Sequence, residues 1–168
     1  AVRVSIGAAP DGWIAYDRFL ARGTAPVPDS GAASGALPVL LCYTSGSTGQ
    51  PKGVVLAQQA LFHNAVNSAH MHDLCSQDVV LTTLPLFHVG GLNIQTTPAL
   101  QLGATVTLHA RFAPDAALEA IARDRPTLTV LVPATIQAMI EHPRWADTPL
   151  DSLRCMTTGS TQVPQRLV

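Results

Sequence analysis

The sequence predicts an α/β fold in which a mainly parallel β-sheet carries helices on both faces. Two observations predict it: short apolar runs typical of strands alternate with segments of helical spacing, and turn residues separate the two kinds of segment. Hydrophobic residues make up 47% of the 168 residues and charged residues only 12%, so the chain has ample material for a core. The length corresponds to about one domain of roughly 100–200 residues.

The expected strands are apolar or β-rich runs that stop at turn residues. The run 37–43 (LPVLLCY) ends in a cluster of Thr, Ser and Gly, and the run 79–84 (VVLTTL) ends at Pro85. These two runs and 128–132 are apolar on both faces, as parallel strands covered by helices should be. The remaining strands are expected at 2–6, 104–108 and 152–157.

The expected helices are marked by apolar spacing and by end signals. Apolar residues recur three and four positions apart in 58–74, and Gly103 is a natural end for a helix over 90–102. Pro114 begins a helix over 114–123 that ends in basic residues. Further helices are expected at 133–140 and after Pro164. Because ligands of such sheets bind at the carboxyl ends of strands, we expect the site to follow Tyr43, Leu84 and Thr157.

One stretch has the composition of a linker, and the chain ends suggest a larger protein. Residues 23–36 are rich in Gly, Ala, Ser and Pro, which predicts a flexible surface loop. The chain starts without Met inside a strand-like segment and stops where a helix begins. We therefore expect residues 1–168 to be part of a longer chain and to pack against its remainder or against another copy.

Composition argues against several classes of protein. The net charge of −1 argues against a nucleic-acid binder that relies on bulk positive charge. No run of about 18 apolar residues occurs, so no membrane span is expected, and the start lacks the apolar core of a signal peptide. Three widely spaced cysteines, Cys42, Cys75 and Cys155, favour free thiols in a reducing cytoplasm. A cytoplasmic location is therefore expected.

A group of histidines suggests a metal site, but their spacing argues against it. His63, His70, His72 and Cys75 fall close together in the sequence. On a helix His63 and His70 share a face, whereas His70 and His72 point in nearly opposite directions. No further ligand completes a tetrahedral set nearby, so we expect no metal site here.

The segment after Tyr43 has the composition of a phosphate-binding loop. Within residues 44–53 (TSGSTGQPKG) lie four hydroxyl side chains, three glycines and Lys52, the only lysine of the chain. Glycines let backbone N–H groups turn inward around an anion, and hydroxyl and ammonium groups add donors. The alternative is a plain strand-to-helix turn. Since no Ser or Thr follows Lys52, this is not a Walker loop.

The stretch 43–54 (YTSGSTGQPKGV) resembles the signature loop of the AMP-forming, adenylate-forming enzymes, a superfamily that includes acyl-CoA synthetases. The resemblance covers residues 37–168 and, more weakly, the start of the chain. It implies part of the large N-terminal domain of an acyl-CoA synthetase-like fold. In the family this loop grips the β- and γ-phosphates of ATP. By that match the phosphate-binding residues are Thr44, Ser45, Gly46, Ser47, Thr48, Gly49 and Lys52.

Two later segments extend the resemblance. The stretch 84–92 (LPLFHVGGL) resembles the segment that lines the acyl pocket and the adenylate carboxyl, which implies a catalytic role for His88. The alternative is a half-buried structural histidine. The stretch 153–164 resembles the strand and loop that meet adenine, with Thr161-Gln162 where the family usually has Ala-Pro. The remaining acyl- and adenine-site residues implied are Phe87, Gly90, Gly91, Gly159, Ser160 and Thr161.

The resemblance implies an ATP-dependent acid–thiol ligase. A carboxylic acid would react with ATP and Mg²⁺ to give an acyl-adenylate, and coenzyme A would then displace AMP. The family's later metal-binding, ribose-binding and C-terminal lysine segments have no counterpart here. We therefore expect the C-terminal domain to be absent from these residues and the isolated chain to be inactive. Two alternatives stay open: an acyl-AMP ligase that feeds a carrier protein, and a non-catalytic nucleotide-binding or interaction module.

Overall fold

The computed structural model describes residues 3–23, 34–45 and 49–167 of the chain. The chain forms two compact units, residues 1–33 and 34–168. In the first unit, strands β1 (Val4–Ser5) and β2 (Ile14–Ala15) pair in parallel and helix α1 (Tyr16–Leu20) follows directly. The strand expected at 2–6 is thus confirmed over two residues. Residues 24–33 of the expected loop lie outside the described residues.

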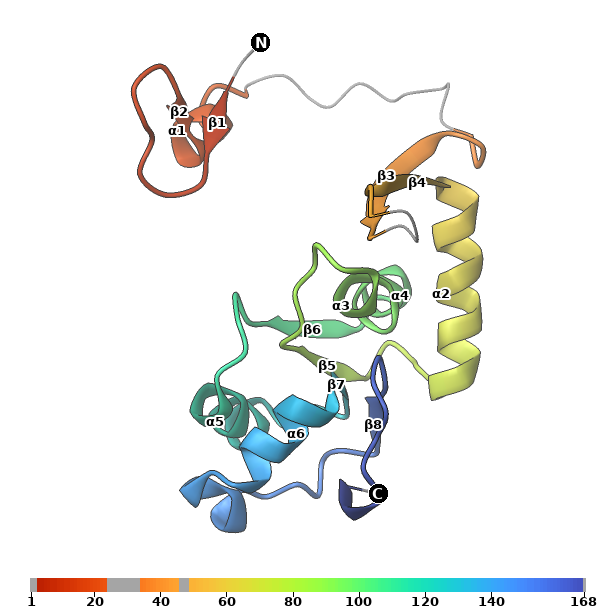
Figure 1. The fold of residues 1–168 in the computed structure, drawn as a ribbon, viewed down its shortest axis with the longest axis vertical. Helices are drawn as coiled ribbons and strands as arrows, with labels where there is room; N and C mark the ends of the chain where they lie inside the picture. The colour runs from red at the N-terminus through yellow and green to blue at the C-terminus, as the bar shows by residue number, and fades with distance from the viewer. Residues whose placement is uncertain (1–2, 24–33, 46–48, 168) are drawn as a thin grey trace. The chain divides into compact units, whose positions relative to one another are not determined.

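The second unit is built on a four-stranded parallel sheet, as predicted (Figure 1). The strands lie in the order β6-β5-β7-β8, and every neighbouring pair is parallel. Parallel neighbours require crossover connections, and helices supply most of them. The strands are β5 (Val79–Thr82), β6 (Thr105–Leu108), β7 (Leu128–Leu131) and β8 (Cys155–Thr158).

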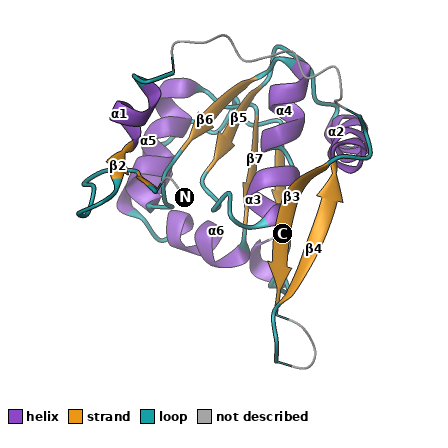
Figure 2. Cartoon of the chain, turned by 90° about the horizontal axis from the view of Figure 1, so that it is seen from above, coloured by secondary structure: helices purple, strands orange, loops and turns teal. Residues whose placement is uncertain are grey.

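Helices cover both faces of this sheet, which confirms the predicted layers (Figure 2). Successive strand residues point to opposite faces, so Leu81 joins one apolar cluster and its neighbour Val80 another. The cluster around Leu81 is supplied by α5 (Pro114–Asp124) and α6 (Pro133–Ile140). The cluster around Val80 includes Ala99 of α4 (Thr96–Leu102), and Ala69 of α2 (Gln58–His72) packs against it.

The strand expected at 37–43 forms, but not as a member of the parallel sheet. Strand β3 (Pro38–Thr44) pairs antiparallel with β4 (Lys52–Ala57), a strand that the sequence reasoning missed. The glycine-rich segment therefore closes a hairpin and is not a strand-to-helix turn. Apolar side chains of β3 are exposed, as expected if another surface covers them in a longer chain: Leu41 is 52% exposed and Tyr43 is 70% exposed.

The single helix expected over 90–102 is two helices, α3 (Val89–Asn93) and α4. The hydroxyl of Thr96 donates to the carbonyl oxygen of Gly91 at 2.7 Å, and the hydroxyls of Thr82 and Thr96 lie 2.8 Å apart. Gln95, with φ −130° and ψ −30°, forms the break. Because side-chain hydroxyls satisfy groups that a continuous helix would pair internally, the chain can turn here. Gly103 ends α4 in a left-handed conformation, as predicted.

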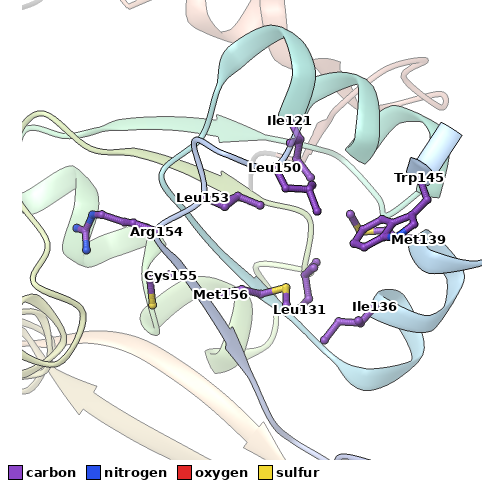
Figure 3. Close-up of a pocket in the computed structure, with 10 residues that line it drawn as sticks. All are labelled: Ile121, Leu131, Ile136, Met139, Trp145, Leu150, Leu153, Arg154, Cys155 and Met156. Atoms are coloured by element: carbon purple, nitrogen blue, oxygen red, sulfur yellow. The ribbon is translucent and has the colours of Figure 1, made fainter. Parts of the chain in front are cut away.

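The chain after α6 adds partly buried apolar side chains to the cluster around Leu81. A 3₁₀ turn (Pro143–Asp147) leads to β8, and a second 3₁₀ turn (Gln165–Leu167) stands where a helix was expected to begin. Between α6, the first turn and β8 lies a cavity of about 240 Å³ (Figure 3). Trp145, Met139, Leu150 and Met156 line it with other apolar side chains. Over the residues described, no helix is both long and apolar enough to cross a membrane.

Candidate functional site

The order of the strands fixes where a ligand can enter the parallel sheet. From β5 the chain crosses to β6 on one side, and it returns to β7 on the other side of β5. At such a reversal the loops leaving the two strands part, which opens a crevice at their carboxyl ends. A cavity of about 270 Å³ lies there. It is lined by Leu84, Pro85, His88, Gly90, Gly91, Val132 and Ser160.

His88 borders this crevice with its ring held in one orientation. It is the residue that precedes α3, and its Nδ1 accepts the backbone N–H of Gly90 at 3.0 Å. A backbone N–H can only donate, so Nδ1 is unprotonated and the neutral ring carries its proton on Nε2. His88 is exposed, and its second nitrogen is therefore a donor available to a bound ligand.

Two further cavities also reach His88. One of about 530 Å³ is bordered by His88, Gly90 and Ser160 together with residues of α2. The other, of about 410 Å³, joins Thr44 and Ser45 of the hairpin to Phe87 and His88. The structure thus brings residues from all three predicted segments to one histidine, although Phe87 itself is 91% exposed. Gly49, Lys52, Gly159 and Thr161 line none of these three cavities.

The two glycines after His88 serve different purposes. A Cβ at Gly91 would lie 2.4 Å from the carbonyl oxygen of Pro85 and 2.8 Å from that of Leu84. Backbone atoms cannot yield at such distances, so only glycine lets α3 pack this closely on the loop after β5. A Cβ at Gly90 would instead meet the ring of His88, 3.1 Å from Nδ1. Gly91 sets the wall of the crevice, and Gly90 orients the histidine.

The predicted phosphate loop begins and ends on the β3–β4 hairpin. Thr44 pairs with Lys52 across its base, where the Thr44 hydroxyl lies 3.5 Å from the carbonyl oxygen of Lys52. Gly49 has a positive φ of 78°, a conformation that favours glycine. Gly46, Ser47 and Thr48 lie outside the described residues. Lys52 is exposed, so its ammonium group is accessible beside the loop.

The third segment follows β8. Gly159, Ser160 and Thr161 leave the carboxyl end of this strand, and Ser160 has a φ of 69°. A positive φ costs free energy in any residue other than glycine, so the surrounding structure must hold this turn in place. Ser160 borders both the 270 Å³ and the 530 Å³ cavities.

Sequence reasoning missed the wall that α2 contributes to the largest of these cavities. Asn64, Asn67 and Met71 recur at helical spacing and line it, together with Asn93 of α3. The side-chain amide of Asn64 donates to the carbonyl oxygen of Asn93 at 2.7 Å, which ties the two helices together. The spacing of polar residues along the predicted helix 58–74 was the signal that could have identified this face.

Known proteins resemble this chain in sequence and in fold. The sequence profile of a family described as "AMP-binding enzyme" matches residues 5–168. An indoleacetate–CoA ligase from Aromatoleum aromaticum is 56% identical over 165 residues, which are 98% of this chain and 32% of the relative. A feruloyl-CoA synthase from an Amycolatopsis species is 44% identical over 128 residues, which are 76% of this chain and 26% of that relative. The chain thus spans about a third or less of the length of these relatives.

Solved structures show the same fold. The inhibitor-bound N-terminal domain of FACL13 from Mycobacterium tuberculosis superposes with a TM-score of 0.78 at 29% identity. That match covers 92% of this chain and 39% of the solved chain. The o-succinylbenzoate CoA synthetase of Bacillus subtilis gives a TM-score of 0.70 at 33% identity, covering 80% of this chain and 27% of the solved one.

Proposed function

The chain belongs to the AMP-binding enzyme family, and from this premise we propose that it forms part of the large N-terminal domain of an ATP-dependent acid–thiol ligase. We refer to that longer protein as the parent enzyme. The reaction has two steps. A carboxylate attacks the α-phosphorus of ATP and releases pyrophosphate, and the thiol of coenzyme A then attacks the acyl carbon and releases AMP. The observation that carries the proposal is the meeting of three segments around His88.

In the first step the chain supplies electrostatic stabilisation. Negative charge accumulates on the departing β- and γ-phosphates, and preorganised donors around them lower the barrier. The loop from Thr44 to Lys52 offers hydroxyls, backbone N–H groups and one ammonium group for this purpose. Mg²⁺ would accompany the phosphates of ATP. Since no group of three or more His, Cys, Asp or Glu within the described ranges could hold a metal ion, we assign no ligand for it in this chain.

His88 acts on the carboxyl end of the acid. Its Nε2–H, fixed by the hydrogen bond from Gly90 to Nδ1, can donate to a carboxylate oxygen of the acid or of the adenylate. Such a contact orients the attacking oxygen towards the α-phosphate and gains strength as water is excluded. His88 thus sits between the hairpin that would hold the phosphates and the cavity that would hold the acyl group.

The acyl group would occupy the cavity of about 530 Å³ between α2, α3 and the loop after β8. Its lining combines apolar side chains, Met71 and Ile94 among them, with the amides of Asn64 and Asn67. Such a wall suits a flat, mostly apolar ring that carries a polar atom. Since the relatives above are named for indoleacetate and ferulate, we propose an aromatic carboxylic acid as the substrate class.

The test is the reaction of the purified parent enzyme. With ATP, Mg²⁺ and a panel of aromatic and aliphatic acids, we expect AMP release and exchange of pyrophosphate into ATP, fastest with aromatic acids. Free coenzyme A should then yield a thioester. A thioester on a carrier protein but not on coenzyme A would identify the acyl-AMP ligase alternative. Absence of acid-dependent exchange with the whole panel would contradict the proposal.

A further inference from the structure

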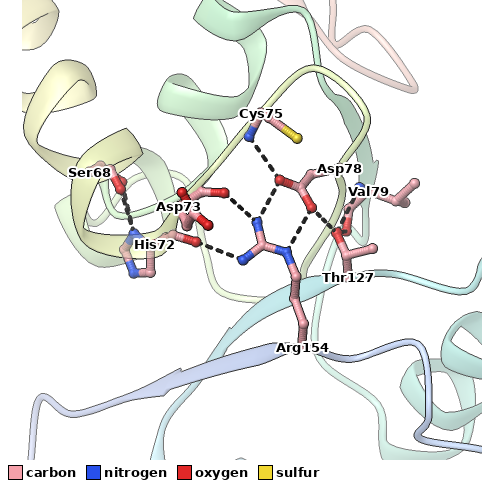
Figure 4. A network of polar contacts seen from close by, with 8 residues as sticks. All are labelled: Ser68, His72, Asp73, Cys75, Asp78, Val79, Thr127 and Arg154. Atoms are coloured by element: carbon pink, nitrogen blue, oxygen red, sulfur yellow. Dashed lines mark hydrogen bonds and ion pairs between the residues drawn. The ribbon is translucent and has the colours of Figure 1, made fainter.

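His72 is a buried histidine that has no role in the proposed reaction, and its side chain connects helix α2 to strand β8. His72 is the last residue of α2 and is 4% exposed. Its Nδ1 lies 2.9 Å from the carbonyl oxygen of Ser68, and its Nε2 lies 2.9 Å from the hydroxyl of Thr157 on β8. The second contact joins positions 85 residues apart. Figure 4 shows His72 beside Ser68 at the end of α2.

The donor and the acceptor of each hydrogen bond around His72 can be assigned. The carbonyl of Ser68 can only accept, so in the neutral ring Nδ1 carries the proton and Nε2 accepts the hydroxyl proton of Thr157. The side-chain amide of Gln95 then donates to the Thr157 oxygen at 3.3 Å. Gln95 is 1% exposed and forms the break between α3 and α4. One threonine hydroxyl therefore joins α2, the α3–α4 junction and β8.

The same contacts reach the proposed acyl cavity. The hydroxyl of Ser68 donates to the carbonyl oxygen of Ile94, and both residues line the 530 Å³ cavity. Thr157 stands three residues before Ser160, which also lines that cavity. Within the described residues β8 has a single neighbouring strand, β7, whose pairing reaches Thr158 at the end of β8, and the contacts of Thr157 add a second anchor there. The turn that follows has the positive φ of Ser160 and needs such support.

We propose that His72 is a positioning residue. By accepting a hydrogen bond from the Thr157 hydroxyl, it holds the end of β8 in place and so keeps Ser160 beside His88 at the cavities that both residues line. His72 touches no substrate in this scheme. The inference rests on the proposed function, because it gives the Ser160 turn a place in binding the acid. It goes beyond that function by assigning roles to His72, Thr157 and Gln95.

The decisive variant is Thr157→Val in the parent enzyme, because valine keeps the shape and loses the hydroxyl. We expect the KM for the acid to rise about tenfold, since small misplacements of binding groups are costly. Thr157→Ser, which restores the hydroxyl, should return the KM to within about twofold of the original. His72→Phe should resemble Thr157→Val, and the double variant should be no worse than the more damaging single one.

A matched control separates positioning from stability. Thr129 is a fully buried threonine on β7 whose hydroxyl donates to the carbonyl oxygen of Leu81 at 2.9 Å. Thr129→Val should lower the melting temperature to a similar degree and leave the KM unchanged. If Thr157→Val also left the KM unchanged, or if Thr129→Val raised it equally, His72 would be a structural residue and the inference would be wrong.

A second readout does not depend on activity. Hydrogen exchange should be faster at the amides of 158–161 in Thr157→Val and unchanged there in Thr129→Val. Equal exchange in both variants would overturn the inference. A parent enzyme that forms no acyl-adenylate would contradict the proposed function alone, and the exchange measurement would still decide whether His72 positions the turn.

Discussion

Arg154 contacts both carboxylate oxygens of Asp78, with Nη2 2.7 Å from Oδ2 and Nε 3.1 Å from Oδ1 (Figure 4). The same guanidinium donates to the carbonyl oxygens of His72 and Asp73, where α2 ends. Arg154 directly precedes β8, so this pair fastens the start of that strand to the end of the helix. Asp78 also accepts the hydroxyl of Thr127 at 2.7 Å and the backbone N–H of Cys75 at 2.8 Å.

The Arg154–Asp78 pair predicts that the folded state loses stability at acidic pH. Burial by itself would raise the pKa of Asp78, but the hydrogen bonds from Arg154, Thr127 and Cys75 and the guanidinium charge lower it to about 2. Because the folded pKa lies below the usual 3.8, the stabilisation is complete above about pH 4 and is lost as the pH falls towards 2. We expect on the order of 2 kcal/mol of unfolding free energy to disappear across that window.

The measurement is the unfolding free energy of the parent enzyme by urea titration from pH 6 to pH 2. Asp78→Asn should lower the stability at pH 6 and flatten the acid dependence. The control is Asp151→Asn, which removes an exposed pair in which Arg125 also contacts both carboxylate oxygens, there through its two terminal nitrogens. Exposed pairs contribute little, so that variant should match the wild type. Equal effects of the two substitutions would contradict the prediction.

Lys52→Ala should slow pyrophosphate exchange severely in the parent enzyme. The ammonium group stands beside the hydroxyl- and glycine-rich loop, and its loss removes a charge from the place proposed for the departing phosphates. We expect a loss of about 100-fold or more in kcat. Arg22→Ala, in the first unit, removes a positive charge outside the loop and serves as the control. Unchanged exchange in Lys52→Ala would make the loop a plain turn.

His88→Ala should lower thioester formation while nucleotide binding is largely kept. The substitution removes the Nε2–H donor proposed to orient the carboxylate, and His88 is exposed, so few packing contacts are lost. We expect a decrease of about 10²–10³-fold in kcat/KM for the acid. His70→Ala, an exposed histidine on α2 that lines none of the three cavities, is the control. A variant whose main defect is a lower melting temperature would show that His88 is structural.

Replacing Gly90 or Gly91 by alanine should affect stability and substrate binding differently. Gly91→Ala forces a Cβ against the backbone oxygens of Leu84 and Pro85, so we expect a loss of about 1–3 kcal/mol of stability. Gly90→Ala presses on the His88 ring, which can rotate away. That variant should keep most of its stability and raise the KM for the acid. Thermal unfolding and steady-state kinetics of the two variants check this, and identical behaviour would contradict it.

The isolated chain should associate and should not turn over substrate. Strands β3 and β4 expose apolar side chains, Leu41, Tyr43 and Val55 among them, at 52%, 70% and 60%. Apolar patches of this kind are usually covered by another surface. Sedimentation should detect species larger than a monomer, and Leu41→Lys with Val55→Lys should reduce their fraction. A monomeric chain that releases AMP with acids and ATP would contradict the expectation that the chain requires the rest of the parent enzyme.

Local signals in the sequence determined most of the elements. Short continuous apolar runs located β5 and β7, Pro114 located the start of α5, and Gly103 located the end of α4, because each signal depends on a few neighbouring residues. The three segments of the candidate site were also recognised from short motifs. The extent to which their individual residues bind ligands stays a prediction.

Tertiary structure decided what no local signal encodes. Whether residues 37–43 join the parallel sheet or pair with 52–57 depends on which strand lies alongside. The helix expected over 90–102 breaks because the Thr96 hydroxyl, buried among packed elements, donates a hydrogen bond to the carbonyl oxygen of Gly91. The sheet order places Ser160 beside His88, and a single hydroxyl connects His72 to Thr157. Hydrogen bonds and packing act between residues close in space, so partners far apart along the chain become identifiable only once the sheet is assembled.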